Sequence, residues 1–306
     1  MTAKLHGLVA ATHTPFDADG RLNLAAVEAQ AGHLIRTGVT TAFVGGSTGE
    51  CHSLTVEERL ALADRWTAVA RGTPLRIVVH VGGNCLADAR TLAAHAQSVG
   101  AMAIAALAPS YFKPATVNDL VTCCADIAGA APGLPFYFYD IPSMTSVRLP
   151  MPEFLTVAAG LIPTFAGIKF TNPDLMAYLQ CLRIWNGWCD VPWGIDEWLL
   201  AALAVGAVGV VGSSYNFAAP VYRRLMAAFA AGDLTAARRE QFRSVQLIEV
   251  LSGFGYMAAA KAAMGFLGVD VGPPRLPFAP LTGESRDGLR AELERMGFFD
   301  WVRPSN

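Results

Sequence analysis

The stretch DVPWGIDEWLLAALAVGAVGVVGS, residues 190–213, contains the last two apolar segments of strand length in the chain. These segments, DVPWGI (190–195) and VGVVGS (208–213), are separated by a longer pattern rich in leucine and alanine. Such an alternation of short apolar segments and longer amphipathic ones is typical of repeated strand–helix units. This alternation permits two folds, a closed (β/α)8 barrel and an open doubly wound sheet. The number of strand–helix units in the whole chain distinguishes them.

Six similar apolar segments precede this stretch, and amphipathic patterns such as TVEERLALADRWTAVARG lie between them. Several of these patterns close near a glycine, as helices often do. Eight strand–helix units predict an α/β fold of the (β/α)8 TIM-barrel type, and only the count disfavours a doubly wound open sheet. The predicted strands cover residues 5–12, 40–46, 76–82, 101–109, 135–140, 164–171, 190–195 and 208–213.

The chain continues after the eighth unit with three further helical patterns, near residues 235–252, 255–267 and 285–296. No long polar linker precedes them, so they predict a C-terminal three-helix extension that packs on the barrel. We therefore expect a barrel over residues 1–231 and the extension over residues 232–306.

The composition limits the possible partners of the chain. Of its 306 residues 53% are hydrophobic and 16% charged, and the formal net charge is −2. This balance gives no reason to expect binding to nucleic acid or to an anionic membrane. It favours a small-molecule ligand or another copy of the chain as partner. So few charged residues suggest that part of the apolar surface is buried in contacts between subunits.

Cysteine spacing and the N-terminal sequence indicate a cytoplasmic protein. The six cysteines form neither a CxxC pair nor a Cys/His cluster, so we expect reduced thiols and no metal. The start MTAKLHGLVAATHTPF is a poor signal peptide, and no apolar stretch reaches membrane-spanning length without Gly, Pro or a charge.

Polar residues stand where the predicted strands end, which is where barrel enzymes carry their chemistry. Five strand ends show this feature. They offer Gly46-Ser47-Thr48-Gly49-Glu50, Tyr139-Asp140, Lys169 with Thr171, Asp196-Glu197, and Ser213-Ser214.

Lys169, in the predicted strand FAGIKFT (165–171), has two possible roles. Its ammonium group could reach water at the wet end of the strand. Alternatively, burial could lower its pKa and leave a neutral amine that attacks a carbonyl to form a Schiff base. The Gly-rich GGSTGE turn could hold a substrate anion, and a phenol from the preceding strand could move protons. Tyr137 and Tyr139 share a face of that strand, so alternation cannot choose between them.

The GGSTG sequence also matches the G-x-S-x-G pattern of serine hydrolases, with Ser47 as nucleophile. A hydrolase of that fold needs a histidine late in the chain. All six histidines lie in the first third, which disfavours this alternative: His6, His13, His33, His52, His80 and His95.

Several motifs together resemble those of the pyruvate-dependent class I aldolases, the family of dihydrodipicolinate synthase and N-acetylneuraminate lyase. The resemblance runs from about residue 7 to residue 298, with the motifs in family order and spacing. They are GGSTGE (45–50), APSYFKP (108–114), YDIP (139–142), GIKFTNPDL (167–175), GIDEWLL (194–200) and VGSSYN (211–216).

The resemblance implies a role for each matching position. Lys169 would form the Schiff base with pyruvate, and Ser47 and Thr48 would bind the pyruvate carboxylate. Tyr139 would be the proton-transferring phenol. Tyr111 would reach into the site of a neighbouring subunit of a homotetramer. No cofactor is implied, because the protonated imine itself withdraws electrons.

The resemblance also bears on the second substrate. Dihydrodipicolinate synthases carry an arginine shortly after the YxxP motif, where this chain has Ser143 and Met144. The GIDE and VGSS motifs instead match the lyase branch, which cleaves the 2-keto acid sugar N-acetylneuraminate to pyruvate and N-acetylmannosamine. The residues that would bind the sugar chain are Asp196, Glu197, Ser213, Gly194 and Thr171.

The sequence also permits other interpretations. The aldehyde could differ, as in a 2-keto-3-deoxy sugar acid aldolase or an enzyme like dihydrodipicolinate synthase. A barrel without catalytic activity could bind pyruvate as a sensor. Asp196 and Glu197 could simply be acidic residues at a helix N-terminus, where they are favourable.

Overall fold

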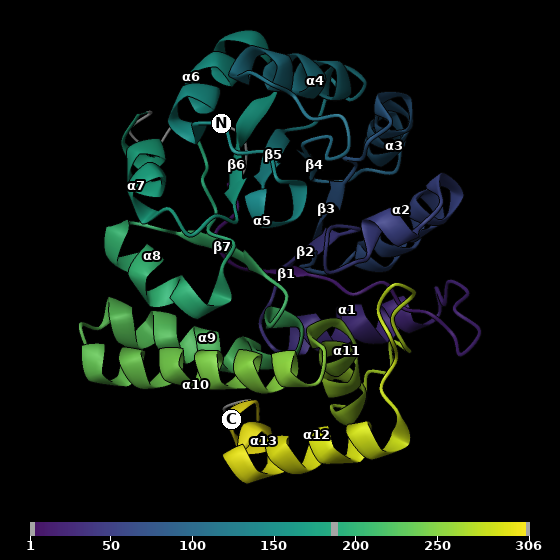
Figure 1. Ribbon diagram of the computed structural model, residues 1–306, viewed down its shortest axis with the longest axis vertical. Helices are drawn as coiled ribbons and strands as arrows, with labels where there is room; N and C mark the ends of the chain where they lie inside the picture. The colour runs from purple at the N-terminus through teal and green to yellow at the C-terminus, as the bar shows by residue number, and fades with distance from the viewer. Residues whose placement is uncertain (1–3, 185–188, 304–306) are drawn as a thin grey trace.

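The computed structural model describes residues 4–184 and 189–303 and shows a parallel barrel surrounded by helices (Figure 1). Seven strands pair in the order β6-β5-β4-β3-β2-β1-β7, and every pair is parallel. They are β1 (Gly7–Ala11), β2 (Thr41–Val44), β3 (Arg76–His80), β4 (Ala103–Leu107), β5 (Phe136–Asp140), β6 (Phe165–Phe170) and β7 (Gly209–Gly212).

The gap between β6 and β7 is closed by the segment predicted as the seventh strand. The N–H of Ile168 donates to the carbonyl of Asp190 at 2.9 Å, and that of Val211 donates to the carbonyl of Trp193 at 2.7 Å. This segment forms isolated parallel bridges rather than a regular strand. Pro192 lies between the bridges and has no N–H to donate to a ladder. The sheet is thus a (β/α)8 barrel, and an open doubly wound sheet is excluded.

The strands are buried on both faces, because side chains fill the barrel interior and helices cover its outside. Side chains such as Val9, Phe43 and Tyr139 fill the interior, while alternate positions such as Ala10 and Val44 pack outward against the helices. The helices of this layer are α1 (Ala26–Arg36), α2 (Val56–Ala70), α3 (Leu86–Ser98), α4 (Val117–Gly129), α6 (Met151–Leu161), α7 (Leu175–Ile184), α8 (Leu199–Val205) and α9 (Tyr215–Ala230), with the single turn α5 (Pro142–Thr145) after β5.

The three predicted C-terminal helices are present, followed by one additional turn. They are α10 (Leu234–Gly253), α11 (Tyr256–Phe266), α12 (Gly283–Met296) and α13 (Phe298–Trp301), and they lie along one side of the barrel (Figure 1). Helix α10 packs lengthwise on α9. The predicted boundary after residue 231 lies between these two helices, which are in contact. The division into a barrel and an extension therefore stays a prediction.

Membrane-spanning potential is limited to one bent pair of helices. No single helix in the described ranges is long and apolar enough to cross a membrane, and α10 with α11 reaches that length only across a 113° bend.

Candidate active site

A cavity of about 740 Å³ opens at the carboxyl ends of the barrel strands. Its wall comes from the loops after the strands, from α10 and α11, and from the loop between α11 and α12. Nine of the ten predicted site residues line it: Ser47, Thr48, Tyr139, Lys169, Thr171, Gly194, Asp196, Glu197 and Ser213. Within the described ranges, no three His, Cys, Asp or Glu side chains are grouped so as to hold a metal ion.

Lys169 extends from β6 into the barrel interior, and only 3% of the residue is exposed. Its Nζ lies 3.7 Å from the ring centroid of Tyr139 and 4.3 Å from that of Phe43. Burial lowers the pKa of Lys169 to about 7, although the carboxylate of Asp196 opposes this shift. The side chain is therefore not one that reaches water, and a large fraction of it is a neutral amine near neutral pH.

Tyr139 is the phenol next to this amine, because it pairs with Lys169 across β5 and β6. Its hydroxyl lies 3.4 Å from Oγ of Ser47. Burial raises the pKa of Tyr139 to about 12, so the free site holds a protonated phenol. The hydroxyl of Tyr137 instead donates to the Asp190 carboxylate at 3.0 Å, and Tyr137 does not line the cavity.

The turn after β2 presents Ser47 and Thr48 to the cavity. The N–H of Glu50 donates to the carbonyl of Ser47 at 3.0 Å, and the N–H of Cys51 donates to that of Gly46 at 3.2 Å. In the part of the chain that the structure describes, the N–H groups of Ser47 and Thr48 have no protein acceptor. Free N–H groups beside two hydroxyls can bind a carboxylate.

The histidines do not form a serine hydrolase triad with Ser47. Within the described ranges, the side-chain hydroxyl of Ser47 bonds the phenol of Tyr139 and no imidazole. His80 lies behind that phenol, where Nδ1 bonds the carbonyl of Gly45 at 2.9 Å and Nε2 accepts from the N–H of Leu107 at 3.3 Å. Both of its nitrogens are thus occupied.

The two adjacent carboxylates of the GIDE motif have different surroundings. Oδ2 of Asp196 accepts from the backbone N–H and from the hydroxyl of Ser214. Oδ1 lies against Gly212, where a Cβ atom would overlap it. Burial raises the pKa of Asp196, and burial together with Asp196 raises that of Glu197. Glu197 is half-buried on the cavity wall, and it is the more accessible of the two carboxylates.

Thr171, Gly194 and Ser213 complete the wall around Lys169. The buried Oγ1 of Thr171 has no hydrogen-bond partner among the described residues. Gly194 lies against it so closely that a Cβ atom there would overlap this oxygen. Oγ of Ser213 lies 2.6 Å from the hydroxyl of Tyr256, the first residue of α11.

Tyr111 is the one predicted site residue that the structure does not bring to the cavity. It is 77% exposed, and its ring packs edge-on against that of Phe112, which is 86% exposed. The backbone N–H groups of Ser110 and Tyr111 both donate to the side-chain oxygen of Asn84. This anchored loop holds two large aromatic rings out from the surface of the single chain.

Sequence reasoning missed the contribution of the C-terminal extension to the cavity. Tyr256 and Met257 line it from α11, and Pro277 and Phe278 line it from the loop that follows. The GFG sequence before Tyr256 signals a helix break but says nothing about which cavity the next helix faces. The loop offers only its prolines, which mark irregular structure.

Comparisons with known proteins identify the family. The family model described as "Dihydrodipicolinate synthetase family" matches residues 4–296. N-acetylneuraminate lyase of Gallus gallus is 40% identical over 301 residues, covering 97% of this chain and 98% of that protein. The structure of Proteus mirabilis N-acetylneuraminate lyase superimposes with a TM-score of 0.94 at 41% identity, covering 97% of this chain and 100% of that one. The native N-acetylneuraminate lyase (sialic acid aldolase) from Aliivibrio salmonicida gives a TM-score of 0.94 at 42% identity, with coverage of 97% and 98%. The chain therefore belongs to the dihydrodipicolinate synthetase family, as the motifs at its strand ends predict.

Proposed function

We propose that this protein is a Schiff-base aldolase that reversibly cleaves N-acetylneuraminate into pyruvate and N-acetylmannosamine. The observation that carries the proposal is the buried Lys169 amine beside the Tyr139 phenol on the wall of a large cavity. The similarity over nearly the whole chain to proteins named N-acetylneuraminate lyase supports the choice of substrate.

The reaction begins when the neutral amine of Lys169 attacks the C2 ketone of the open-chain sugar. Loss of water from the carbinolamine gives an imine, whose protonated form withdraws electrons from C3. An amine with a pKa of about 7 is available for this attack at neutral pH without a separate base. The substrate carboxylate would bind at the Ser47–Thr48 turn, because both residues line the cavity and their N–H groups have no acceptor among the described residues.

Bond cleavage requires that a proton leave the C4 hydroxyl. We assign this proton to Tyr139, whose phenol lies next to the position of the imine. The phenol is protonated in the free site and gives its proton to the hydroxyl that leaves the carbinolamine as water. The iminium cation formed in that step would stabilise the phenolate beside it, which then accepts the C4 proton. Breaking the C3–C4 bond then releases N-acetylmannosamine and leaves the enamine of pyruvate. Protonation at C3 and hydrolysis release pyruvate and restore Lys169.

The rest of the cavity suits a polyol chain. Glu197, Ser213 and the unpartnered Oγ1 of Thr171 offer hydrogen-bonding groups to hydroxyls, and a carboxylate can accept from two of them. Among the described residues no arginine lines the cavity, so a second carboxylate on the aldehyde would lack a cationic partner. Ser143 and Met144 occupy the wall where such an arginine would stand. This argues against an aldehyde that carries its own carboxylate.

The direct test is pyruvate release from N-acetylneuraminate, compared with release from 2-keto-3-deoxy sugar acids that lack the N-acetyl group. We expect the highest kcat/KM for N-acetylneuraminate. A clear preference for another 2-keto acid would keep the imine chemistry and overturn the substrate assignment. Condensation of pyruvate with a carboxylated aldehyde, if faster than with N-acetylmannosamine, would do the same.

We also propose that the protein assembles as a homotetramer. The exposed Tyr111 and Phe112 pair supports this proposal, because two large apolar rings held away from the surface are an unfavourable arrangement in an isolated chain. Tyr111 would then contribute to the site of a neighbouring copy, as the APSYFKP motif predicts.

A further inference from the structure

Glu50, the last residue of the GGSTGE turn, has an unusual backbone conformation. Its φ of 54° and ψ of 39° lie in the left-handed region, which non-glycine residues rarely occupy. Such a conformation persists when surrounding contacts over-determine it, and it is found preferentially at functional sites. The same turn carries Ser47 and Thr48, so the contacts that hold Glu50 also bear on the proposed carboxylate site.

Two contacts from the C-terminal extension hold the Glu50 side chain. Nζ of Lys261, on α11, lies 2.8 Å from Oε1. The backbone N–H of Arg275, in the loop after α11, donates to Oε2 at 2.8 Å. Nζ of Lys261 also donates to the carbonyl of Pro273 at 3.0 Å, so a single ammonium group joins the turn to that loop. Neither member of the Glu50–Lys261 ion pair has an accessible side chain.

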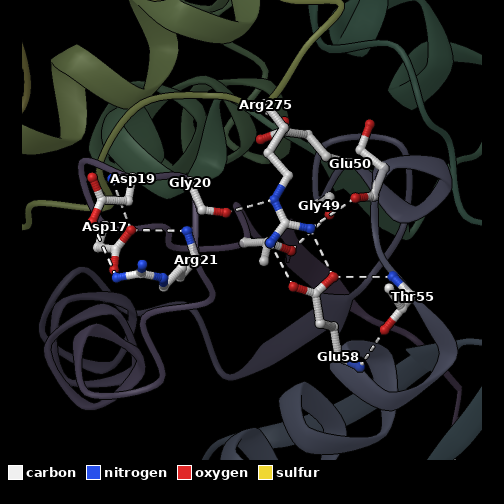
Figure 2. Close-up of polar contacts among 11 residues, drawn as sticks. Asp17, Asp19, Gly20, Arg21, Gly49, Glu50, Thr55, Glu58 and Arg275 are labelled. Carbon is white, nitrogen blue, oxygen red and sulfur yellow. Dashed lines mark hydrogen bonds and ion pairs between the residues drawn. The ribbon is translucent and has the colours of Figure 1, made fainter.

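The side chain of Arg275 fixes the loop itself. Figure 2 shows its guanidinium between Gly20 and Glu58, with Glu50 beside its backbone. Nε donates to the carbonyl of Gly20 at 2.8 Å, and one terminal nitrogen donates to the Glu58 carboxylate at 2.7 Å. Glu58 is also the capping-box residue of α2, which pairs with Thr55 (Figure 2). The loop is thereby tied to the N-terminal segment and to the helix that follows the turn.

The opposite side of the turn is held from β1. Oγ1 of Thr14, which follows β1, donates to the carbonyl of Gly49 at 2.6 Å in a buried position. The turn is therefore anchored at Gly49 by the segment after β1 and at Glu50 by the extension. Ser47, Thr48 and Glu50 all line the cavity, and among the described residues the N–H groups of Ser47 and Thr48 have no acceptor. Although Glu50 belongs to the cavity wall, its side chain has no exposed surface, so we expect it to act on a ligand through the shape of the turn.

We propose that Glu50 is a positioning residue for the carboxylate-binding turn, and that Lys261 and Arg275 make the C-terminal extension a structural part of the pyruvate site. This inference rests on the proposed aldolase function. It assigns to the extension a role in binding pyruvate that is distinct from covering the barrel. Loss of the ion pair should weaken capture of the carboxylate more than it slows the chemistry at Lys169.

The test compares pyruvate binding in Glu50→Gln and in the double variant Glu50→Gln/Lys261→Met, which replaces the ion pair with neutral groups of similar size. The pyruvate concentration at half-maximal formation of the borohydride-reducible adduct should rise about tenfold or more, because small misplacements of positioning groups have effects of this size. In the synthetic direction, KM for pyruvate should rise while KM for N-acetylmannosamine stays unchanged. If Glu50→Gln alone fails to fold, the double variant replaces it in the test, because it leaves no unpaired charge in the buried position.

Glu240→Gln is the matched control. Glu240 is also a buried carboxylate of the extension, paired with Arg224 at 2.9 Å and Arg243 at 2.6 Å, but it joins α10 to α9 rather than to the turn. This variant should lose stability and keep its pyruvate half-saturation. An equal rise in Glu240→Gln, or none in the Glu50 variants, would overturn the positioning role. If the unaltered protein forms no adduct with pyruvate, the aldolase function fails and this inference falls with it.

Discussion

Burial of Lys169 is the residue-scale property on which the account depends. An ammonium group enclosed by Phe43 and Tyr139 loses most of its hydration, and the nearby carboxylate of Asp196 only partly compensates. The site therefore stabilises the neutral amine, which is the nucleophilic form. A lysine at an exposed strand end would keep its ordinary pKa and have no comparable reactivity at neutral pH.

The rate of imine formation should follow this pKa. Below a pH of about 7 the ammonium form predominates and cannot attack, so the rate should increase with pH through about 7 and level off above it. The measurement is the initial rate of the reducible pyruvate adduct at pH values on both sides of that pKa. A rise centred near 10.5, the ordinary lysine value, would show that burial does not activate Lys169.

The two tyrosines of β5 allow a sharp comparison. Tyr139→Phe removes the hydroxyl beside Lys169 and should lower kcat by about 10²–10⁴-fold, the usual contribution of general acid–base catalysis. Imine formation should slow as well, because the carbinolamine must also exchange protons. Tyr137→Phe removes a hydroxyl that binds Asp190. It should cost about 1–2 kcal/mol of stability and leave kcat unchanged.

Steady-state kinetics and thermal unfolding of both variants check this prediction. Similar falls in kcat for Tyr137→Phe and Tyr139→Phe would indicate a general packing effect and remove the assignment of the proton to Tyr139.

At the scale of elements, the short 3₁₀ helix η2 (Asp196–Trp198) gives two adjacent carboxylates different surroundings. Both carboxylates belong to the cavity wall, but Oδ2 of Asp196 accepts from Ser214, whereas Glu197 is the more exposed of the two. We expect Glu197→Gln to raise KM for N-acetylneuraminate by about tenfold, in line with one hydrogen bond to a charged group. The pyruvate half-saturation should not change, because Glu197 would contact the sugar chain.

The measurement for Glu197→Gln is the pair of KM values for N-acetylneuraminate and for pyruvate in the synthetic direction. A parallel increase in both would place Glu197 at the pyruvate end of the cavity instead.

Strand positions could be predicted closely from the sequence because parallel strands buried on both faces are continuous apolar runs. The segment 190–195 was the difficult one, since Pro192 interrupts its ladder while its neighbours still pair. The alternation of residues along β5 could not distinguish Tyr137 from Tyr139, because both side chains face the barrel interior. The two differ only in that Tyr139 lies nearer the carboxyl end of β5. The family motifs favour Tyr139, which lies opposite Lys169, and its role in proton transfer stays a prediction.

Contacts between distant parts of the chain could not be predicted. Glu50 meets Arg275 across 225 positions, and the Ser213–Tyr256 contact depends on how α11 is placed on the barrel. Nothing in the local pattern of either segment records such a contact. The left-handed conformation of Glu50 is equally invisible in sequence, because a glycine would be the usual residue there.

At the scale of the whole molecule, the apolar composition and the exposed aromatic pair make the same prediction. Light scattering should give the mass of four 32.4 kDa chains. Tyr111 and Phe112 should become protected from solvent-borne labels in that assembly, since contact surfaces exclude water. A monomeric mass at working concentration would contradict the tetramer and leave Tyr111 without a role in catalysis.

The whole account depends on a covalent bond between pyruvate and Lys169. The most direct measurement is the intact mass after incubation with pyruvate and borohydride, followed by peptide mapping. We predict one reduced pyruvate adduct per chain, on the peptide that contains Lys169, and none in Lys169→Ala with its fold retained. An adduct elsewhere, or no adduct on a folded chain, would contradict the account.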